Sequence, residues 1–395
     1  MANELWIAGA GSGKTHSIVS EAIEAIGRGE RVLVVTYTTN NQAELRSRFA
    51  ELHGGSSDRF VVKGLYSFYL EDMIRPYQRV IFQTRIATTL FNTGNPHQNS
   101  KTRRTIPGRS EFIDGVINPL HYLSACHTKA HTSLLGKLAC QVAKLSKDAP
   151  AKRLAEIYDR VYFDEVQDLV GWDYQVIKSL NKAMPRSLRC VGDFRQTIYD
   201  TAYGQKAPRT ADEKLNIFLG RLRFQRKTLK TNRRCIQEIC DLGDTVHYGI
   251  ASLYEKTESA VKVIPEAFKQ HLGVYVVRQS EVGAYLQVFQ PMVLKWRGDS
   301  GLKFLPPNTD FYTFGKSKGL GFDRVLVLPT ANFASFLIGD QTAFDADSSD
   351  EARNKLYVAI TRARYSIGFV VEDKVAENWP FPIWMGGDQP GTGES

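Results

Sequence analysis

The stretch that decides the fold of this 395-residue chain is Leu5-Trp6-Ile7-Ala8-Gly9-Ala10-Gly11-Ser12-Gly13-Lys14-Thr15. An apolar run that predicts a buried strand ends at Ala8, a glycine-rich loop covers 9–15, and a helix is expected over 16–27. A loop of this kind aims backbone N–H groups at phosphate oxygens, and the helix N-terminus adds partial positive charge. The sequence therefore predicts a phosphate-binding loop, with Ala8 where the strict pattern has glycine.

This loop predicts a nucleotide-phosphate site with Mg²⁺ as a cofactor. Lys14 would reach the β- and γ-phosphates, and the Thr15 hydroxyl would be a ligand of Mg²⁺. The residues expected to contact the nucleotide are Ala8, Gly9, Ala10, Gly11, Ser12, Gly13, Lys14 and Thr15.

Two further stretches supply the remaining chemistry. The apolar strand 161–163 ends in Asp164, placed to hold Mg²⁺ through water, and Glu165, placed as the general base for the attacking water. Gln196 follows the strand expected next to it, so its amide is a candidate sensor of the γ-phosphate, and Tyr199 offers an aromatic face to a base. Either stretch alone also fits a solvated turn, but together with the phosphate loop they indicate an NTPase.

Composition narrows the class of protein. The chain is 43% hydrophobic and 24% charged, which is typical of a globular protein of two or three domains. Its five cysteines form no disulfide framework, which favours a reducing cytoplasmic location. The net charge is +9, and the segment 75–153 carries thirteen Lys and Arg against three acids. A basic segment of this kind fits either a phosphate-backbone partner or a solvated face.

The order of predicted elements indicates an α/β fold with parallel sheets. Apolar runs at 32–37, 161–163 and 188–191 predict strands of a first domain, 1–228, whose segment 64–155 is expected to be a helical insertion with the basic block. Further strands at 274–277, 325–328 and 366–371 predict a second domain, 229–385. The glycine-rich end, 386–395, is expected to be disordered.

These motifs, taken in order, resemble those of the superfamily 1 helicases of the UvrD, PcrA and Rep type. The stretches 35–38 with 44–46, and 66–68, look like motifs Ia and Ib. The stretches 229–234, 313–323 and 356–363 resemble motifs IV, V and VI. The resemblance extends from residue 8 to 363, nearly the whole chain.

The resemblance implies two RecA-like domains and ATP-driven 3′-to-5′ movement on single-stranded or partly duplex DNA. It implies that Arg234 and Arg362 act as arginine fingers on the γ-phosphate, and that Gly319 lies at the nucleotide. Positions that line the strand channel in this family are Tyr37, Thr38, Tyr66 and Tyr199. The basic run Lys101, Arg103 and Arg104 is a further candidate for nucleic-acid contact.

The chain also departs from the family pattern. Only seven residues precede Ala8, so the adenine-reading glutamine motif is missing and promiscuity among nucleotides is expected. Thr201 and Ala202 replace an aromatic residue and an arginine of motif III, and Gly315 and Gly321 replace the usual His and Glu of motif V. Only 78 residues separate Arg234 from Thr313, so no large accessory domain fits between them.

Two alternatives to an autonomous helicase stay open. The first alternative is a DNA-sensing regulatory ATPase subunit with a protein partner such as a nuclease. It is suggested by small UvrD-like proteins of this outline, which occur beside nucleases in anti-phage systems. An RNA helicase of viral type shares the phosphate loop but fits the later motifs less well.

Overall fold

The computed structural model describes residues 2–91, 94–99, 101–197, 208, 210–247, 254–346 and 350–386. The chain forms two compact units. The first consists of Met1–Ile7, Lys14–Gly192 and Tyr199–Lys227, and the second of Ala8–Gly13, Asp193–Ile198 and Thr228–Ser395. The sequence predicted 1–228 as the first domain and 229–385 as the second, and this division stays a prediction. Of the predicted tail, 387–395 lie outside the described residues.

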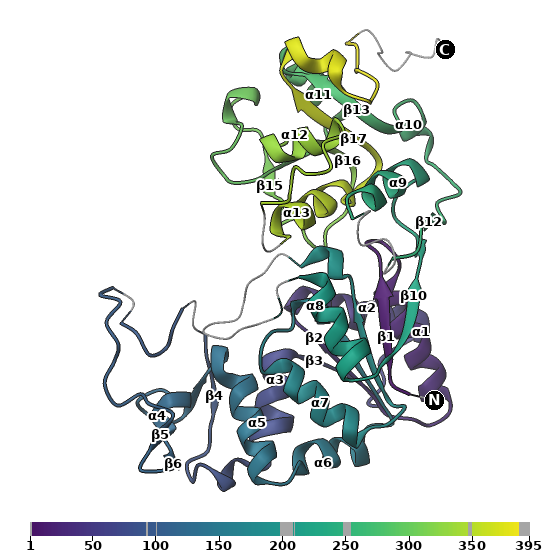
Figure 1. Ribbon diagram of the computed structural model, residues 1–395. Helices are drawn as coiled ribbons and strands as arrows, with labels where there is room; N and C mark the ends of the chain where they lie inside the picture. Colours follow the sequence, from purple (N-terminus) through teal and green to yellow (C-terminus); the bar gives the residue numbers. More distant parts are fainter. Residues whose placement is uncertain are drawn as a thin grey trace. The chain divides into compact units, whose positions relative to one another are not determined.

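The first unit is built on a six-stranded sheet (Figure 1). Its strands, in spatial order, are β10 (Gln225–Leu229), β1 (Glu4–Ala8), β9 (Leu188–Gly192), β8 (Arg160–Asp164), β2 (Val32–Thr36) and β3 (Phe60–Gly64). The pairs from β1 through β3 are parallel, and β8 lies beside β9 as the sequence predicted. The residues Val32–Val35 are at most 1% exposed, because helices cover both faces of such a sheet.

Outside the insertion, the α-helices of the first unit are α1 (Lys14–Gly27), α2 (Thr39–His53), α7 (Asp173–Ala183) and α8 (Ala211–Asn216). Helices α1 and α2 come directly after β1 and β2 in the chain. Thr38 caps α2 by accepting a hydrogen bond from the Asn41 N–H at 3.1 Å, and Gly54 ends it in the left-handed conformation. In the described part of the chain, each helix is too short or too polar to cross a membrane.

The insertion predicted over 64–155 is mainly helical, but it also contains four short strands. Its helices are α3 (Leu65–Phe68), a π-helix over Tyr69–Ile74, α4 (Pro119–Tyr122), α5 (Leu135–Leu145) and α6 (Ala149–Ile157). The strands β4 (Thr88–Leu90) and β7 (Lys129–His131) pair in parallel, and β5 (Phe112–Ile113) and β6 (Val116–Ile117) form a hairpin. Strands of two or three residues leave no periodic signal, so the sequence did not predict them.

The second unit has its own parallel sheet, in the order β13 (Gly273–Arg278), β17 (Ala363–Val371), β16 (Phe322–Val327), β14 (Met292–Lys295) and β15 (Phe311–Thr313). A small parallel pair, β11 (Thr231–Asn232) and β12 (Glu258–Ser259), adjoins it in sequence. The helices are α9 (Gln237–Thr245), α10 (Glu266–Lys269), α11 (Val282–Phe289), α12 (Ala331–Leu337) and α13 (Glu351–Ile360). The chain therefore has the predicted α/β fold with two RecA-like parallel-sheet domains.

Between β11 and β15, the described residues form strands and helices that belong to this unit. The hydrophobic core of the unit includes Ala10 together with Cys235 and Cys240. All five cysteines are free, so these two are buried thiols. The presence of Ala10 in this core explains why the segment 8–13 groups with the second unit.

Candidate active site

The glycine-rich loop follows β1 and leads directly into α1. Gly11 and Gly13 have φ angles of +71° and +76°, which L-residues rarely adopt, and the Ser12 N–H donates to the Gly9 carbonyl at 3.2 Å. The helix begins at Lys14, so Lys14 and Thr15 occupy its first turn. The loop thus has the tight shape and the helix N-terminus that a phosphate site needs.

Residues distant in sequence surround the loop segment 8–13 within the second unit. The Asn232 amide donates to the Ala10 carbonyl at 2.8 Å, and the Arg233 N–H donates to the Gly11 carbonyl at 2.8 Å. A Cβ on Gly11 would lie 2.6 Å from Asn232 Oδ1, and one on Gly9 would lie 2.6 Å from Arg195 Nη2. Gly11 is therefore favoured by close packing as well as by its backbone conformation, and Gly9 by close packing against Arg195.

In the first unit, Lys14 meets Glu165 at the carboxyl end of β8. Lys14 Nζ lies 3.0 Å from Glu165 Oε2, and the two side chains are 15% and 16% exposed. Gln167 Nε2 donates to the same carboxylate oxygen. Glu165 itself has a left-handed φ of 57°, which turns the chain sharply after the strand. The two residues predicted to touch phosphate and water are thus brought together.

Asp164, the residue before Glu165, is buried. Its Oδ2 accepts a hydrogen bond from Thr36 Oγ1 at 3.2 Å, whereas its Oδ1 is buried without a hydrogen-bond partner. Burial, and next the negative charge of Glu165, raise the pKa of Asp164 to about 7, although Lys14 and Thr36 oppose the shift. A bound cation would supply the partner that this carboxylate oxygen lacks.

The available ligands fit Mg²⁺ bound together with phosphates. No group of three or more His, Cys, Asp or Glu side chains in the described ranges is arranged to hold a metal by itself. Mg²⁺ commonly uses one or two protein oxygens and completes its shell with water and substrate phosphates. Asp164 and the Thr15 hydroxyl, which follows Lys14 in α1, are such oxygen donors. The Ser12 hydroxyl in the loop is also buried without a partner.

The second unit brings Arg234 and Arg362 together around one carbonyl group. Arg362 Nη1 donates to the Leu320 carbonyl at 2.8 Å, and Arg234 Nη1 approaches the same oxygen at 3.3 Å. Burial, and next the charge of Arg234, lower the pKa of Arg362 to about 10. Gly319, with a φ of +86°, shapes the turn that presents this carbonyl. Within the described residues neither arginine forms an ion pair, so the pair carries uncompensated positive charge.

Gln196 belongs to a hydrogen-bonded chain that reaches the phosphate loop. Its Nε2 donates to Asp193 Oδ2 at 2.8 Å, and the Tyr357 hydroxyl donates to the same oxygen at 3.2 Å. The Tyr357 hydroxyl in turn accepts the Ala10 N–H at 3.0 Å. Arg195, whose guanidinium lies 4.5 Å from the Tyr357 ring centroid, pairs with Asp193 from the other side. The loop backbone and the predicted sensor are thereby joined within the second unit.

The sequence did not assign roles to Asp193, Arg195, Asn232 and Tyr357. Each lies inside a stretch that the sequence singled out: 191–199, 229–234 or 356–363. The motifs therefore included these four residues, but only the folded chain shows which of them contact the loop.

Of the residues predicted to bind nucleic acid, two lie together. The Tyr37 and Tyr66 hydroxyls are 3.2 Å apart, and their rings meet edge to face with centroids 6.0 Å apart. Burial raises the pKa of both tyrosines. Thr38 caps α2, and Tyr199 lies outside the described residues. Lys101, Arg103 and Arg104 are exposed on a separate loop whose turn Asn99 closes.

Comparison with known proteins agrees with the motif series in the N-terminal region. Residues 2–91 match the UvrD/REP helicase N-terminal domain. A solved structure described as "Complex structure of Arterivirus nonstructural protein 10 (helicase) with DNA" is 14% identical, with a TM-score of 0.42. That similarity covers 93% of this chain and 60% of the arterivirus chain, so this chain spans about three fifths of that protein's length. A search of the curated proteins found no match.

The phosphate loop between β1 and α1, and the parallel sheet that carries Asp164 and Glu165, define a P-loop protein of RecA-like fold. The match of residues 2–91 to the UvrD/REP helicase N-terminal domain agrees with the resemblance to superfamily 1 helicases that the motifs predicted.

Proposed function

We propose that this protein is a nucleic-acid-stimulated ATPase that moves in the 3′-to-5′ direction along single-stranded DNA. The observation that carries the proposal is the Lys14–Glu165 ion pair at 3.0 Å beside Asp164, whose buried Oδ1 has no partner. The match to the UvrD/REP helicase N-terminal domain supports helicase-type use of ATP. The direction of movement rests on the resemblance of the motifs alone.

The first unit supplies the groups for phosphoryl transfer. Lys14 and the loop N–H groups would bind the phosphates, while Asp164 and Thr15 would hold Mg²⁺, which when bound neutralises charge on the transferring phosphoryl group. Lys14 cannot contact a γ-phosphate and keep its full ion pair with Glu165. As Lys14 turns to the phosphate, Glu165 would lose this ion pair and could accept a proton from the attacking water.

The second unit supplies positive charge and a link to the loop. Arg234 and Arg362 lack a carboxylate partner in the described chain and would stabilise the charge of the transferring γ-phosphoryl group. Because Tyr357 bonds to both Ala10 and Asp193, a change in the loop on phosphate loss would reach Gln196. This chain is a route by which hydrolysis alters the second unit.

We propose that Tyr37 and Tyr66 contact the bases of the bound single strand. Their rings are half-buried side by side, and stacking of a base on such a ring contributes about 1–3 kcal/mol without regard to sequence. This mode of contact suits a motor that moves along any sequence.

The test is ATP hydrolysis by the purified chain, alone and with single-stranded DNA, duplex DNA with free ends, and RNA. Lys14→Ala serves as the blank. Stimulation by single-stranded DNA supports the proposal, and stimulation by RNA alone would replace it with an RNA-dependent activity. Movement in the opposite direction on a strand blocked at one end would contradict the assigned polarity.

A second candidate function is a DNA-sensing ATPase subunit that controls a partner such as a nuclease. It is favoured by one observation: the described residues between β11 and β15 form no accessory domain that would assist strand separation. A strand-separation assay discriminates between the two. Processive unwinding by the isolated chain would exclude the subunit function, whereas DNA-stimulated hydrolysis without unwinding would favour it.

A further inference from the structure

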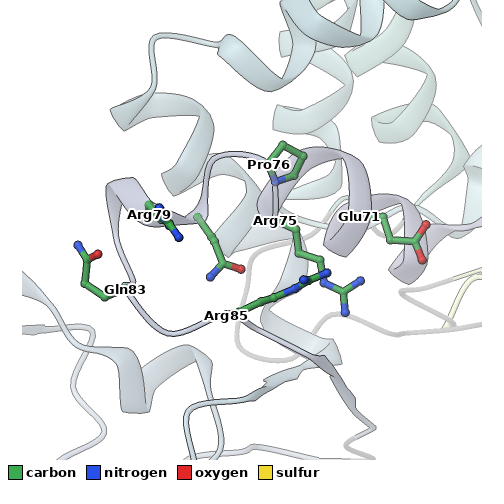
Figure 2. Close-up of a pocket in the computed structure, with 7 residues that line it drawn as sticks. Glu71, Arg75, Pro76, Arg79, Gln83 and Arg85 are labelled. Atoms are coloured by element: carbon green, nitrogen blue, oxygen red, sulfur yellow. The ribbon is translucent and has the colours of Figure 1, made fainter.

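A pocket of about 650 Å³ lies in the insertion of the first unit (Figure 2). We call it the arginine pocket. It is lined by Glu71, Arg75, Pro76, Gln78, Arg79, Gln83 and Arg85. None of these residues belongs to the candidate active site or to the predicted basic run 101–104. Three cations and one carboxylate therefore surround a cavity to which the motifs assign nothing.

The frame of the arginine pocket is fixed by a buried polar side chain. Gln78 is 5% exposed; its amide donates to the Thr84 carbonyl at 2.8 Å and accepts the Ile86 N–H at 3.2 Å. Arg75 Nε donates to the Ile86 carbonyl at 2.9 Å, and its Nη2 donates to the Ala87 carbonyl. The loop that carries Arg79 and Arg85 is thereby held in place before any ligand arrives.

The charge inside the arginine pocket is not compensated. The carboxylate of Glu71 is paired with Lys63 at 3.1 Å. In the part of the chain that the structure describes, Arg75, Arg79 and Arg85 form no ion pair, and the Arg75 guanidinium contacts backbone carbonyls only. In Figure 2 the side chains of Arg75 and Arg85 point toward the same part of the arginine pocket. Like charges that line one pocket without a carboxylate partner favour an anion there.

The chemistry of the lining identifies the anion. A planar guanidinium fork matches phosphate oxygens, and the lining contains no aromatic side chain on which a base would stack. We propose that the arginine pocket binds a phosphate group of a nucleic-acid strand, held by Arg75 and Arg85 with Arg79 at the rim. Such a contact positions the strand without reading its sequence. The inference rests on the proposed action on nucleic acid and adds a separate anchoring site to it.

The test replaces Arg85, because Arg75 also holds the loop. Strand affinity is measured without nucleotide, by the fluorescence anisotropy of labelled single strands with a 5′-phosphate or a 5′-hydroxyl. We expect Arg85→Ala to weaken binding about tenfold, the effect of losing a hydrogen-bonded charge pair. The slope of log affinity against log salt should become shallower by about 0.7, as for one phosphate of a single strand. Arg85→Lys should keep the slope and lose only part of the affinity, because lysine keeps the charge without the fork.

The matched control is Lys152→Ala, which removes one exposed charge from α6 of the same insertion outside the pocket. Its affinity should stay within about twofold of the wild type, as expected for an exposed charge. Equal weakening on both strands assigns an internal phosphate to the pocket, and weakening on the phosphorylated strand alone assigns a terminal one. Thermal melting of each variant verifies the fold.

An Arg85→Ala protein that binds like the wild type, or that loses no more than the Lys152→Ala control, would overturn the proposal. Failure of the proposed function would give a separate result, because no nucleic-acid strand would then stimulate ATP hydrolysis by the wild type. The anisotropy comparison would still show whether the arginine pocket binds a strand phosphate. Arg85→Ala should need about tenfold more DNA than the wild type for half-maximal stimulation of ATP hydrolysis.

Discussion

The two charged clusters of this protein are built in opposite ways. In the first unit, Lys14 is paired with Glu165, and the neighbouring Asp164 keeps one buried oxygen without a partner. In the second unit, Arg234 and Arg362 share the Leu320 carbonyl and have no carboxylate partner among the described residues. The first cluster therefore lacks a cation and the second lacks an anion.

This difference indicates which part of a nucleotide complex each cluster suits. A carboxylate with an open oxygen suits a divalent cation, and two guanidinium groups held only by a carbonyl suit a phosphate. Burial of either cluster without its missing partner costs free energy, because buried charges are stable only when they are paired or hydrogen-bonded. Sites that are incomplete in this way are typical of binding and catalysis rather than of stability.

The largest expected loss of activity comes from a substitution in the second cluster, Arg234 and Arg362. Arg362→Lys keeps a positive charge but cannot reproduce the bonds to Val358, Ser317 and Leu320. We expect kcat for ATP hydrolysis to fall about 10³-fold or more, as for the loss of an arginine finger. Steady-state hydrolysis with saturating single-stranded DNA measures it. The control is Arg364→Lys, which alters an exposed arginine paired with Asp323. Equal kcat values for the two variants would show that the second cluster is structural.

The next effect tests the first cluster. Glu165→Gln keeps the shape of the side chain and removes its basicity, so we expect kcat to fall about 10²–10⁴-fold while ATP still binds. A fluorescent-nucleotide titration measures binding, and steady-state hydrolysis measures turnover. Glu156→Gln, an exposed change on α6, is the control. Near-normal turnover by Glu165→Gln would assign the general base to another residue.

A smaller effect tests the link between the loop and Gln196. Tyr357→Phe removes the hydroxyl that accepts the Ala10 N–H and donates to Asp193. We expect KM for ATP to rise about two- to tenfold, the value of one hydrogen bond, with a smaller change in kcat. Tyr285→Phe deletes another buried hydroxyl of the second unit, one bonded to His271, and should leave KM unchanged. If both variants have the same KM, Tyr357 has only a packing role.

The smallest effect is on stability and concerns Asp164. Because burial raises the pKa of Asp164 to about 7, its proton stabilises the fold at low pH, and this contribution is lost as the pH rises through about 7. Asp164→Asn removes the titration and retains an oxygen for Thr36. We expect the variant to melt roughly 3–5 °C above the wild type at pH 8 and by a clearly smaller margin at pH 5, because the wild type loses this stabilisation gradually between about pH 4 and pH 7.

Thermal melting without Mg²⁺ or nucleotide measures this difference. Asp114→Asn, on the exposed hairpin of the insertion, is the control and should follow the wild type at both pH values. A constant offset of Asp164→Asn at pH 5 and pH 8 would mean that Asp164 does not titrate in this range.

The arginine pocket extends the comparison to a third cluster. Like Arg234 and Arg362, its arginines form no ion pair among the described residues, but Arg79 and Arg85 are exposed. The sequence pointed to the basic segment 75–153 as a whole, which contains these arginines, and within it to the run Lys101, Arg103 and Arg104, because consecutive charges are easy to see. The pocket was missed because its frame depends on Gln78, and no local pattern shows that a glutamine will be buried and bonded to Thr84 and Ile86.

Sequence by itself determined the strand-loop-helix at 4–27, the strand that ends at Asp164 and its place beside β9, because apolar runs and glycines act locally. Tertiary structure alone decided that Tyr357 bonds to Ala10, 347 positions away, and that Arg234 and Arg362 share one carbonyl. It also decided that one oxygen of Asp164 has no partner. Motifs identify which residues carry charge, but whether a charge is buried, paired or left open depends on packing between distant segments, which no local pattern records.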